Sequence, residues 1–444
     1  MKDKLATYFE FKALGTNFKT EIIAGLTTFL SMAYILFVNP AVLSLSSVEN
    51  LEPGMGMDPG AVFVATALAS AIGTFVMGIY AKYPIALAPG MGINGFFAYT
   101  LVLGMGIPWE TALAGVFVAG ILFVILTFTG TREQIINAIP HELKLAISSG
   151  IGLFATFIGL RISGIITSRP STLLTLGDLS DGNVLLSVFG LFLIIGLMVK
   201  GVKGAIFYGM AITSITGILF GLINMPTQIV GSIPSLEPTF GVAIRYIPSI
   251  FTAEMLLVVF TLLFLDLFDT AGTLVAVATQ AGLMKNGELP RAQQGFFADA
   301  SATLVGGVLG TSTTVSYVES TSGVAAGGRS GFASVITGSC FLIALFFSPL
   351  LSVITSAVTA PALIVVGILM ASSLKDINWK EFETAVPAFF TVLMMPLAHS
   401  IITGIAIGFI FFPFTMTLKG RKSEVHPFMY TMAVAFIFYF AFRV

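Results

Sequence analysis

The chain has 444 residues, of which 56% are hydrophobic and only 10% are charged, and its formal net charge is −1. Apolar runs of about 17 to 25 residues recur along it, each long enough for a helix across a hydrocarbon core of roughly 30 Å. Such unbroken runs exclude the alternating pattern of a membrane β-barrel. We therefore expect an all-α polytopic membrane protein, and we find no basic stripe that would bind nucleic acid.

Fourteen spans are predicted in chain order, and the third and tenth are short and rich in Gly, Pro, Ser and Thr. These two are expected to be broken, part extended and part helical. The spans cover approximately residues 20–39, 60–80, 84–104, 111–130, 143–161, 184–200, 203–222, 252–280, 294–310, 311–328, 331–355, 358–374, 384–399 and 401–418. A last apolar stretch, 428–442, is either a fifteenth crossing or a helix lying at the membrane interface.

The distribution of Lys and Arg predicts a cytoplasmic N-terminus. With that orientation, seventeen of the 21 basic residues fall in inside segments, including Arg132 and Lys285. The outside segments carry only Arg161, Arg169 and Arg245, and Arg443 is not assigned to either side. Excess positive charge on the cytoplasmic side is the rule for membrane proteins.

The spans divide into two sets of seven, each with a broken third element. The first repeat covers 1–222, the second covers 223–419, and 420–444 forms a C-terminal apolar extension. Seven is odd, so the second repeat must be inverted relative to the first. Inverted repeats with paired discontinuous spans are typical of transporters, whose site lies at the midplane between them.

Each broken span is predicted to pair a short strand with a helix start. In the third span, Pro89 and Gly90 permit an extended, closely approached backbone, and Asn94 falls near the start of the following helix. In the tenth span, 312–318 has the β-branched alternation of a strand, and Glu319 opens the next helix. Two helix N-termini facing one spot would favour a carboxylate or an electron-rich heterocycle there. Asn94 and Glu319 could instead serve only as helix caps.

Acidic side chains within apolar spans are the strongest functional signal. A carboxylate at bilayer depth costs roughly 2.5–3.5 kcal/mol on insertion scales, and its default interpretation is a transport or proton-relay site. Asp266 and Asp269 are three residues apart in the eighth span and hence lie on one helix face. Asp299, near Ser301 in the ninth span, is either a tie between helices or an indirect participant. Asp266 and Asp269 could also be acids that merely join helices.

Several other chemistries lack a sequence signal. No His pair or carboxylate cluster indicates a metal site, and no Walker-type glycine loop indicates nucleotide hydrolysis. The single cysteine, Cys340, allows no intramolecular disulfide. We expect no cofactor other than a coupling ion.

Three separated motifs carry a resemblance that extends over essentially the whole chain. They are ALAPGMGINGFFAYT (86–100), LDLFDTAGTLVAVA (265–278) and GTSTTVSYVESTSGVAAGGRSG (310–331). They resemble the nucleobase:cation symporter-2 superfamily, and more closely its AzgA-like adenine/guanine/hypoxanthine permease branch. The Gln-His pair of the xanthine, uric acid and uracil branches is missing from the first span. That departure favours hypoxanthine, guanine or adenine as cargo.

The resemblance implies a UraA-like fold of fourteen spans with two domains. The core domain would cover about 20–130 and 252–355, and the gate domain about 143–222 and 358–418. By similarity, Asp266, Glu319 and Asn94 match the family's eighth-span acid, tenth-span purine-binding acid and third-span asparagine. The register of Asp269 is not fixed, because the eighth-span motif holds two acids.

Our hypothesis is proton-coupled import of a purine base across a bacterial plasma membrane by a lipid-embedded protein that the resemblance suggests is a homodimer. We assign substrate binding to Glu319, Asn94, Asp266, Ser316, Tyr317 and Phe96, and proton coupling to Asp266 and Asp269. Sodium stays open as the coupling ion. An anion transporter of the same fold and an integral membrane enzyme are the alternatives.

Overall fold

A computed structural model describes residues 2–46, 48, 51–129, 138–169, 172–284 and 289–442. Of Phe268, Tyr439 and Phe442 it describes the backbone only. Arg132, Lys285 and Arg443, used above for the orientation, lie outside the described residues. The described chain is mostly helical, and nine of its helices are long and apolar enough to cross a membrane, with four shorter apolar helices beside them. The expected class, a multi-pass helical membrane protein, is confirmed.

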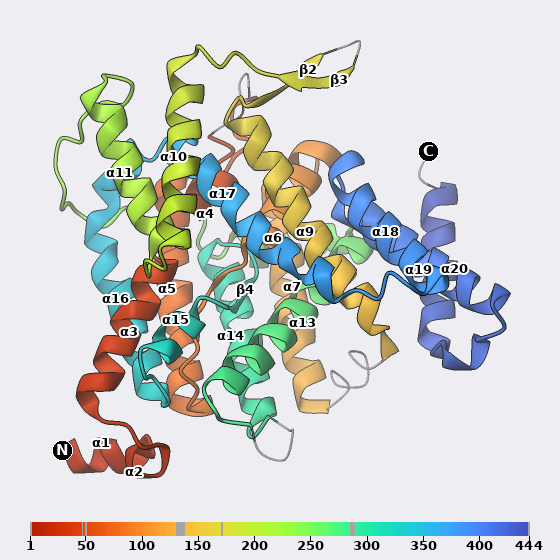
Figure 1. Ribbon diagram of the computed structural model, residues 1–444, viewed down its shortest axis with the longest axis horizontal. Coiled ribbons are helices and arrows are strands. Elements are labelled where there is room, and N and C mark those ends of the chain that lie inside the picture. Colours follow the sequence, from red (N-terminus) through yellow and green to blue (C-terminus); the bar gives the residue numbers. More distant parts are fainter. Residues whose placement is uncertain are drawn as a thin grey trace.

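The elements follow one another as a long series of helices with two small strand pairs (Figure 1). The longer helices are α3 (Phe18–Met32), α4 (Ile35–Leu43), α5 (Pro59–Val76), α7 (Trp109–Thr129), α9 (His141–Ile162), α10 (Gly182–Val199), α11 (Ala205–Leu219), α13 (Ala253–Gln280), α14 (Ala292–Leu309), α16 (Gly331–Ala344), α17 (Ser356–Ala371), α18 (Phe382–Leu397), α19 (Ile401–Leu418) and α20 (Pro427–Phe442). The short α-helices are α1 (Lys2–Tyr8), α2 (Phe11–Leu14), α6 (Met91–Gly95), α12 (Val242–Arg245) and α15 (Ser320–Ala325). The π-helical segments are η1 (Met77–Ala81) and η2 (Phe96–Gly104), and the 3₁₀ segments are η3 (Ile247–Ile250), η4 (Leu345–Val353), η5 (Ser372–Asp376) and η6 (Lys422–Glu424). The strands are β1 (Leu87–Pro89), β2 (Ile166–Arg169), β3 (Leu173–Leu176) and β4 (Thr314–Ser316).

The first span of the structure differs from the predicted one because it is interrupted. Between α3 and α4, at Ala33 and Tyr34, the backbone hydrogen bonds shorten to the 3₁₀ pattern, as in the bond from the Phe37 N–H to the Tyr34 carbonyl. Pro40 lies inside α4 and removes one helical donor, which weakens this part of the helix. The span also continues to Leu43, beyond the predicted end.

Two sets of helices pack mainly among themselves. In the first set, α14 packs against α5 and α7, α16 packs against α3 and α5, and α13 packs against α7. In the second set, α9 packs against α17 and α18, α10 packs against α11 and α17, and α18 packs against α19. Each set joins helices from both halves of the chain, as the interleaved colours of Figure 1 show.

Two features lie at the margins of the bundle, of which only the first was not predicted. β2 and β3 form an antiparallel hairpin that projects from the end of α9 at the top of Figure 1. α20 contains the apolar stretch 428–442 and packs against α19, with Phe436 5.9 Å from Phe409 between ring centroids.

Charged side chains fasten the end of the bundle that holds α1 and α2. Glu10 accepts hydrogen bonds from Lys82 (3.0 Å) and Arg291 (3.3 Å), and the Lys82 ammonium beside it holds the pKa of Glu10 below its usual value. Glu21, which is fully buried in the first turn of α3, accepts from the backbone N–H groups of Arg329 (2.9 Å) and Ser330 (3.3 Å). These donors immediately precede α16, where a carboxylate is favourable.

Replacing Glu21 by Ala is expected to destabilise the protein, because the N–H groups of Arg329 and Ser330 would be buried without their acceptor. The cost of such unpaired donors is about 1–3 kcal/mol each. Thermal unfolding of purified protein in detergent should show a clearly lower midpoint for Glu21→Ala. The exposed Glu52→Ala serves as the control and should unfold like the wild type. Equal midpoints for both variants would contradict the proposed fastening.

Candidate functional site

The two broken spans meet in a short antiparallel strand pair. β1 and β4 are paired with Leu87 opposite Ser316 and Pro89 opposite Thr314, and all six strand residues are buried. The ladder extends by a hydrogen bond from the Gly90 N–H to the Thr313 carbonyl (3.0 Å). Each strand satisfies backbone groups of the other, as buried non-helical backbone requires.

Gly90 is required at the junction between β1 and α6. A Cβ atom added there would lie 2.9 Å from Cγ2 of Val315, closer than real Cβ contacts come. The same added atom would lie 3.6 Å from Oδ2 of Asp269, so this carboxylate lies next to the strand–helix junction.

Side chains add further ties between the two broken spans. The Tyr317 hydroxyl donates to the Pro89 carbonyl (2.6 Å), and the Ser320 hydroxyl accepts from the Ala86 N–H (3.0 Å). The Ser312 hydroxyl donates to Oδ1 of Asn94, which is fully buried. The two segments are thereby joined into one rigid unit.

Asn94 is not a helix cap. It is the fourth residue of α6, Gly90 holds the cap position, and the Asn94 N–H bonds to the Gly90 carbonyl (2.8 Å). Its side-chain amide lies 3.9 Å from the Met91 sulfur in addition to its bond with Ser312. The capping alternative for Asn94 is therefore wrong.

Glu319 occupies the position before α15, but its half-buried side chain makes no capping hydrogen bond. Oε1 of Glu319 instead accepts a hydrogen bond of 2.7 Å from the hydroxyl of Tyr34, at the interruption of the first span. Glu319 therefore occupies the cap position of α15, as that alternative expected, but its side chain bonds to the first span instead of capping the helix. Tyr34 was missed because it lies within an apolar run whose interruption has no local Gly or Pro.

Asp266 and Asp299 lie together in a buried polar cluster between α13 and α14. Thr270 contacts Oδ1 of Asp299 at 2.5 Å and Oδ1 of Asp266 at 3.2 Å. Thr303 contacts Oδ2 of Asp266 at 3.1 Å and the carbonyl of Thr314 at 3.0 Å. Both carboxylates are fully buried, so the cluster replaces their hydration with hydroxyl donors.

Through Asp299 the cluster also reaches the end of β4. Oδ1 of Asp299 accepts from the Ser316 N–H at 3.1 Å. Asp299 therefore ties together α13, α14 and β4. Ser301 is not part of this tie, since its hydroxyl bonds to the Ala298 carbonyl within α14.

The two acids of the eighth span face different neighbours. Asp266 bonds to Thr303 of α14, whereas Asp269 lies beside Gly90 and interacts electrostatically with Asp299 and Glu319. Asp269 and Glu319 thus lie on the side of the strand pair where α13 contacts α15.

Neither Asp269 nor Glu319 takes part in an ion pair in the described part of the chain. The ion pairs there link Glu10 with Lys82 and Arg291, Lys419 with Glu383, and Arg421 with Glu381, Glu383 and Glu424.

The remaining predicted site residues lie in the same region. Phe96 begins η2 and is fully buried, and Tyr317 is 5% exposed at the end of β4. The Ser316 hydroxyl is buried and has no hydrogen-bond partner among the described residues. An unpaired buried hydroxyl beside the strand pair is available to a ligand.

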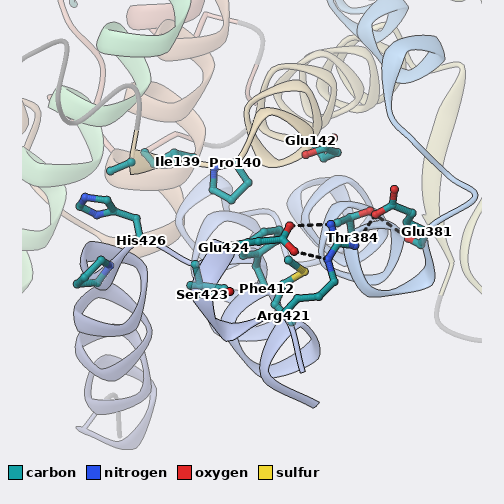
Figure 2. A pocket seen from close by; sticks show the side chains of 14 residues that line it. Ile139, Pro140, Glu142, Glu381, Thr384, Phe412, Arg421, Ser423, Glu424 and His426 are labelled. Carbon is teal, nitrogen blue, oxygen red and sulfur yellow. Dashed lines mark hydrogen bonds and ion pairs between the residues drawn. The ribbon is translucent and has the colours of Figure 1, made fainter. Parts of the chain in front are cut away.

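A cavity of about 550 Å³ lies elsewhere, between the start of α9, the start of α18 and the turn from α19 to α20 (Figure 2). Figure 2 shows Arg421 at its wall, where it bonds to Glu381 (2.7 Å) and Glu424 (2.7 Å). The bonded guanidinium lowers the pKa of Glu424. None of the predicted site residues lines this cavity, and it is a separate feature.

The protein is a multi-pass helical bundle in which two broken spans pair through short strands, with buried acids beside the pair. This architecture is that of a membrane transporter. A sequence profile described as the permease family matches residues 19–407, and the chain belongs to that family, the nucleobase:cation symporter-2 superfamily that its motifs resemble. The members of this family are permeases and not enzymes.

The chain is similar to individual permeases over nearly its whole length. It is 61% identical to the guanine/hypoxanthine permease PbuG of Bacillus subtilis (strain 168), over 99% of this chain and 100% of that protein. It is 39% identical to the adenine permease AdeQ of Escherichia coli (strain K12), over 97% of this chain and 95% of that protein. Among solved structures, the transmembrane domain of the cyanobacterial bicarbonate transporter BicA has a TM-score of 0.63 at 16% identity, covering 88% of this chain and 96% of that one. The last similarity concerns the fold alone.

Gly90→Ala is expected to destabilise the protein, since the new methyl group would displace Val315 and disturb the strand pair. Gly95→Ala is a matched control in the same helix, because its Cβ would make only an ordinary contact of 3.7 Å with Phe154. Thermal unfolding should show a lower midpoint for Gly90→Ala and an unchanged or higher midpoint for Gly95→Ala, because Ala favours a helix interior by about 1 kcal/mol. Unaltered stability of Gly90→Ala would show that the junction tolerates a side chain.

Proposed function

We propose that this chain imports purine nucleobases, namely hypoxanthine, guanine and/or adenine, across a bacterial plasma membrane with its N-terminus in the cytoplasm. The proposal rests first on the 61% identity with a guanine/hypoxanthine permease over that protein's full length. The residues at the strand crossing support it with a chemical reason for binding a flat, nitrogen-rich ring.

Glu319 is the proposed anchor of the base. A carboxylate inside a membrane protein is costly unless donors compensate it, and Glu319 belongs to none of the ion pairs described above. A purine supplies such donors from its ring N–H groups, and Ser316 has a hydroxyl without a partner. Phe96 and Tyr317 are the candidate rings for stacking. Asn94 holds Ser312 through Oδ1, and its NH2 group is the candidate donor to the base.

The proposed architecture has fourteen spans in two inverted repeats. The count consists of the nine long apolar helices and five further segments, which are α6 with η2, α11, α14, β4 with α15, and α18. The antiparallel pairing of β1 with β4 supports the inversion of the repeats. The helix set built on α3, α5, α7, α13, α14 and α16 would be the core domain, and the set built on α9, α10, α11, α17, α18 and α19 the gate domain. The core would rock against the gate, and dimerisation would use the gate.

Proton coupling is the second part of the proposal, and counting hydrogens supports Asp266 as the proton carrier. The Thr303 hydroxyl has one hydrogen and contacts both Asp266 and the carbonyl of Thr314. If Asp266 is protonated, it donates to Thr303, and Thr303 donates onward to Thr314. If Asp266 is ionised, Thr303 can serve only one of the two acceptors. Loss of the proton would therefore loosen the tie between α14 and β4, next to the base. Asp269 would tune this step through its charge.

Cells that lack their own purine transporters provide the test of substrate and coupling. Expression of the chain should give saturable uptake of radiolabelled hypoxanthine, and Glu319→Ala should abolish it, because the base loses its acceptor. A protonophore should prevent accumulation, and replacing sodium in the buffer should not. Normal uptake by Glu319→Ala would contradict the site, and uptake indifferent to the protonophore would contradict the coupling.

Asp266→Asn should separate binding from coupling. The Asn amide can donate to Thr303 as a protonated Asp does, so the variant should bind hypoxanthine and exchange it across vesicle membranes. It has no proton to release, so it should not accumulate the base against a gradient, and its binding should lose the pH dependence of the wild type. Asp266→Ala, which cannot donate, is the contrasting variant. Accumulation by Asp266→Asn would place the coupling proton elsewhere.

Anion transport is the rival function, because the fold is similar to that of a bicarbonate transporter. Carboxylates at the strand crossing disfavour an anion, which would prefer basic side chains there. Competition of unlabelled purines, sulfate and bicarbonate against hypoxanthine uptake separates the two functions: inhibition by purines alone is expected.

A further inference from the structure

We propose that Tyr34 is a positioning residue for the base: its hydroxyl holds one oxygen of Glu319 and directs the other toward the ring N–H groups of the purine. This inference rests on the proposed function and adds to it a residue from the first span, to which the sequence analysis assigned no role.

Tyr34 makes a specific hydrogen bond to Glu319. Its side chain is fully buried, and its hydroxyl lies 2.7 Å from Oε1 of Glu319, the distance of a strong hydrogen bond to a carboxylate. It lies at the 3₁₀ interruption between α3 and α4, while Glu319 lies at the break before α15. The contact therefore joins two irregular points in spans that are 285 residues apart.

Two other hydroxyl groups beside the strand pair have different partners. Tyr317 donates to the carbonyl of Pro89, and Ser320 accepts from the N–H of Ala86. Both bonds join the two broken spans to each other. Among the described side chains, the hydroxyl of Tyr34 is the one that donates to Glu319.

A carboxylate has two oxygens, and fixing one of them fixes the direction of the other. With Oε1 held by Tyr34, the plane of the Glu319 carboxylate is set and Oε2 remains as an acceptor for the base. A phenol can also accept a hydrogen bond, so the same contact persists if Glu319 takes up a proton during the cycle. Phe at position 34 would keep the ring and lose both abilities.

A double-mutant cycle tests this role. The dissociation constant of radiolabelled hypoxanthine would be measured by scintillation proximity on purified protein for the wild type, Tyr34→Phe, Glu319→Gln and the double variant. Tyr34→Phe should weaken binding about 10-fold, the loss of one charge-assisted hydrogen bond. In the Glu319→Gln background the same change should weaken it less than about 2-fold. When Tyr34 holds the amide oxygen, the amide turns its NH2 donor toward the ring N–H groups, so positioning by Tyr34 no longer helps binding.

Tyr83→Phe is the matched control, since Tyr83 is equally buried but lies in the connection between η1 and β1, where its ring faces the Arg291 guanidinium at 5.6 Å. It should bind hypoxanthine like the wild type, and both Phe variants should remain folded at the temperature of the binding assay. If Glu319→Gln binds too weakly to measure, the difference between Tyr34→Phe and Tyr83→Phe decides.

The outcomes distinguish the two proposals. A normal dissociation constant for Tyr34→Phe beside a weakened Glu319→Gln would overturn the role of Tyr34 and leave the purine site intact. An equal loss in both backgrounds would also overturn it, since Tyr34 would then act independently of Glu319. Wild-type protein that binds none of the three bases would overturn the purine proposal and this inference with it.

Discussion

The structure depends on the pairing of two short strands inside a helical bundle. A span that stops being helical exposes backbone N–H and C=O groups, and in an apolar environment each unpaired group costs several kcal/mol. β1 and β4 solve this problem for each other, because in the part of the chain that the structure describes they form a two-stranded sheet of their own. The pairing forces two spans from opposite halves of the chain to meet, and it brings two helix beginnings and several acidic side chains to one place. Gly90 is glycine for the same reason, since the strands approach too closely for a side chain.

The acidic residues around this crossing have different surroundings. Asp266 and Asp299 are enclosed by threonine hydroxyls and join α13, α14 and β4. Asp269 and Glu319 lie at the strand–helix junctions, and Glu319 bonds to the first span through Tyr34. One group is thus suited to holding a proton within a fixed network, and the other to meeting a ligand. Since Asp299 reaches the Ser316 N–H, a change in the first group has a direct physical route to the second.

The fold by itself does not choose the cargo. A bicarbonate transporter domain has a similar fold at 16% identity. Under the proposal of purine transport, the side chains beside the strand pair make this choice, because carboxylates favour a ligand that donates hydrogen bonds over one that carries negative charge. The same frame with basic or neutral residues at these positions would suit an anion.

The sequence by itself determined the helical membrane class, the approximate positions of the long apolar helices and the family. Hydrophobic length and the cost of buried charge act locally, so they can be read along the chain. The broken third and tenth segments were also visible, because Gly, Pro and β-branched residues interrupt helices through their own backbone preferences. Only the tertiary structure decided how the acids are distributed. Asp266 and Asp269 share a helix face, yet one meets Thr303 and the other lies beside Gly90, because α13 packs between different neighbours. The bonds from Tyr34 to Glu319 and from the Arg329 N–H to Glu21 likewise join residues hundreds of positions apart, and no local pattern encodes such a contact.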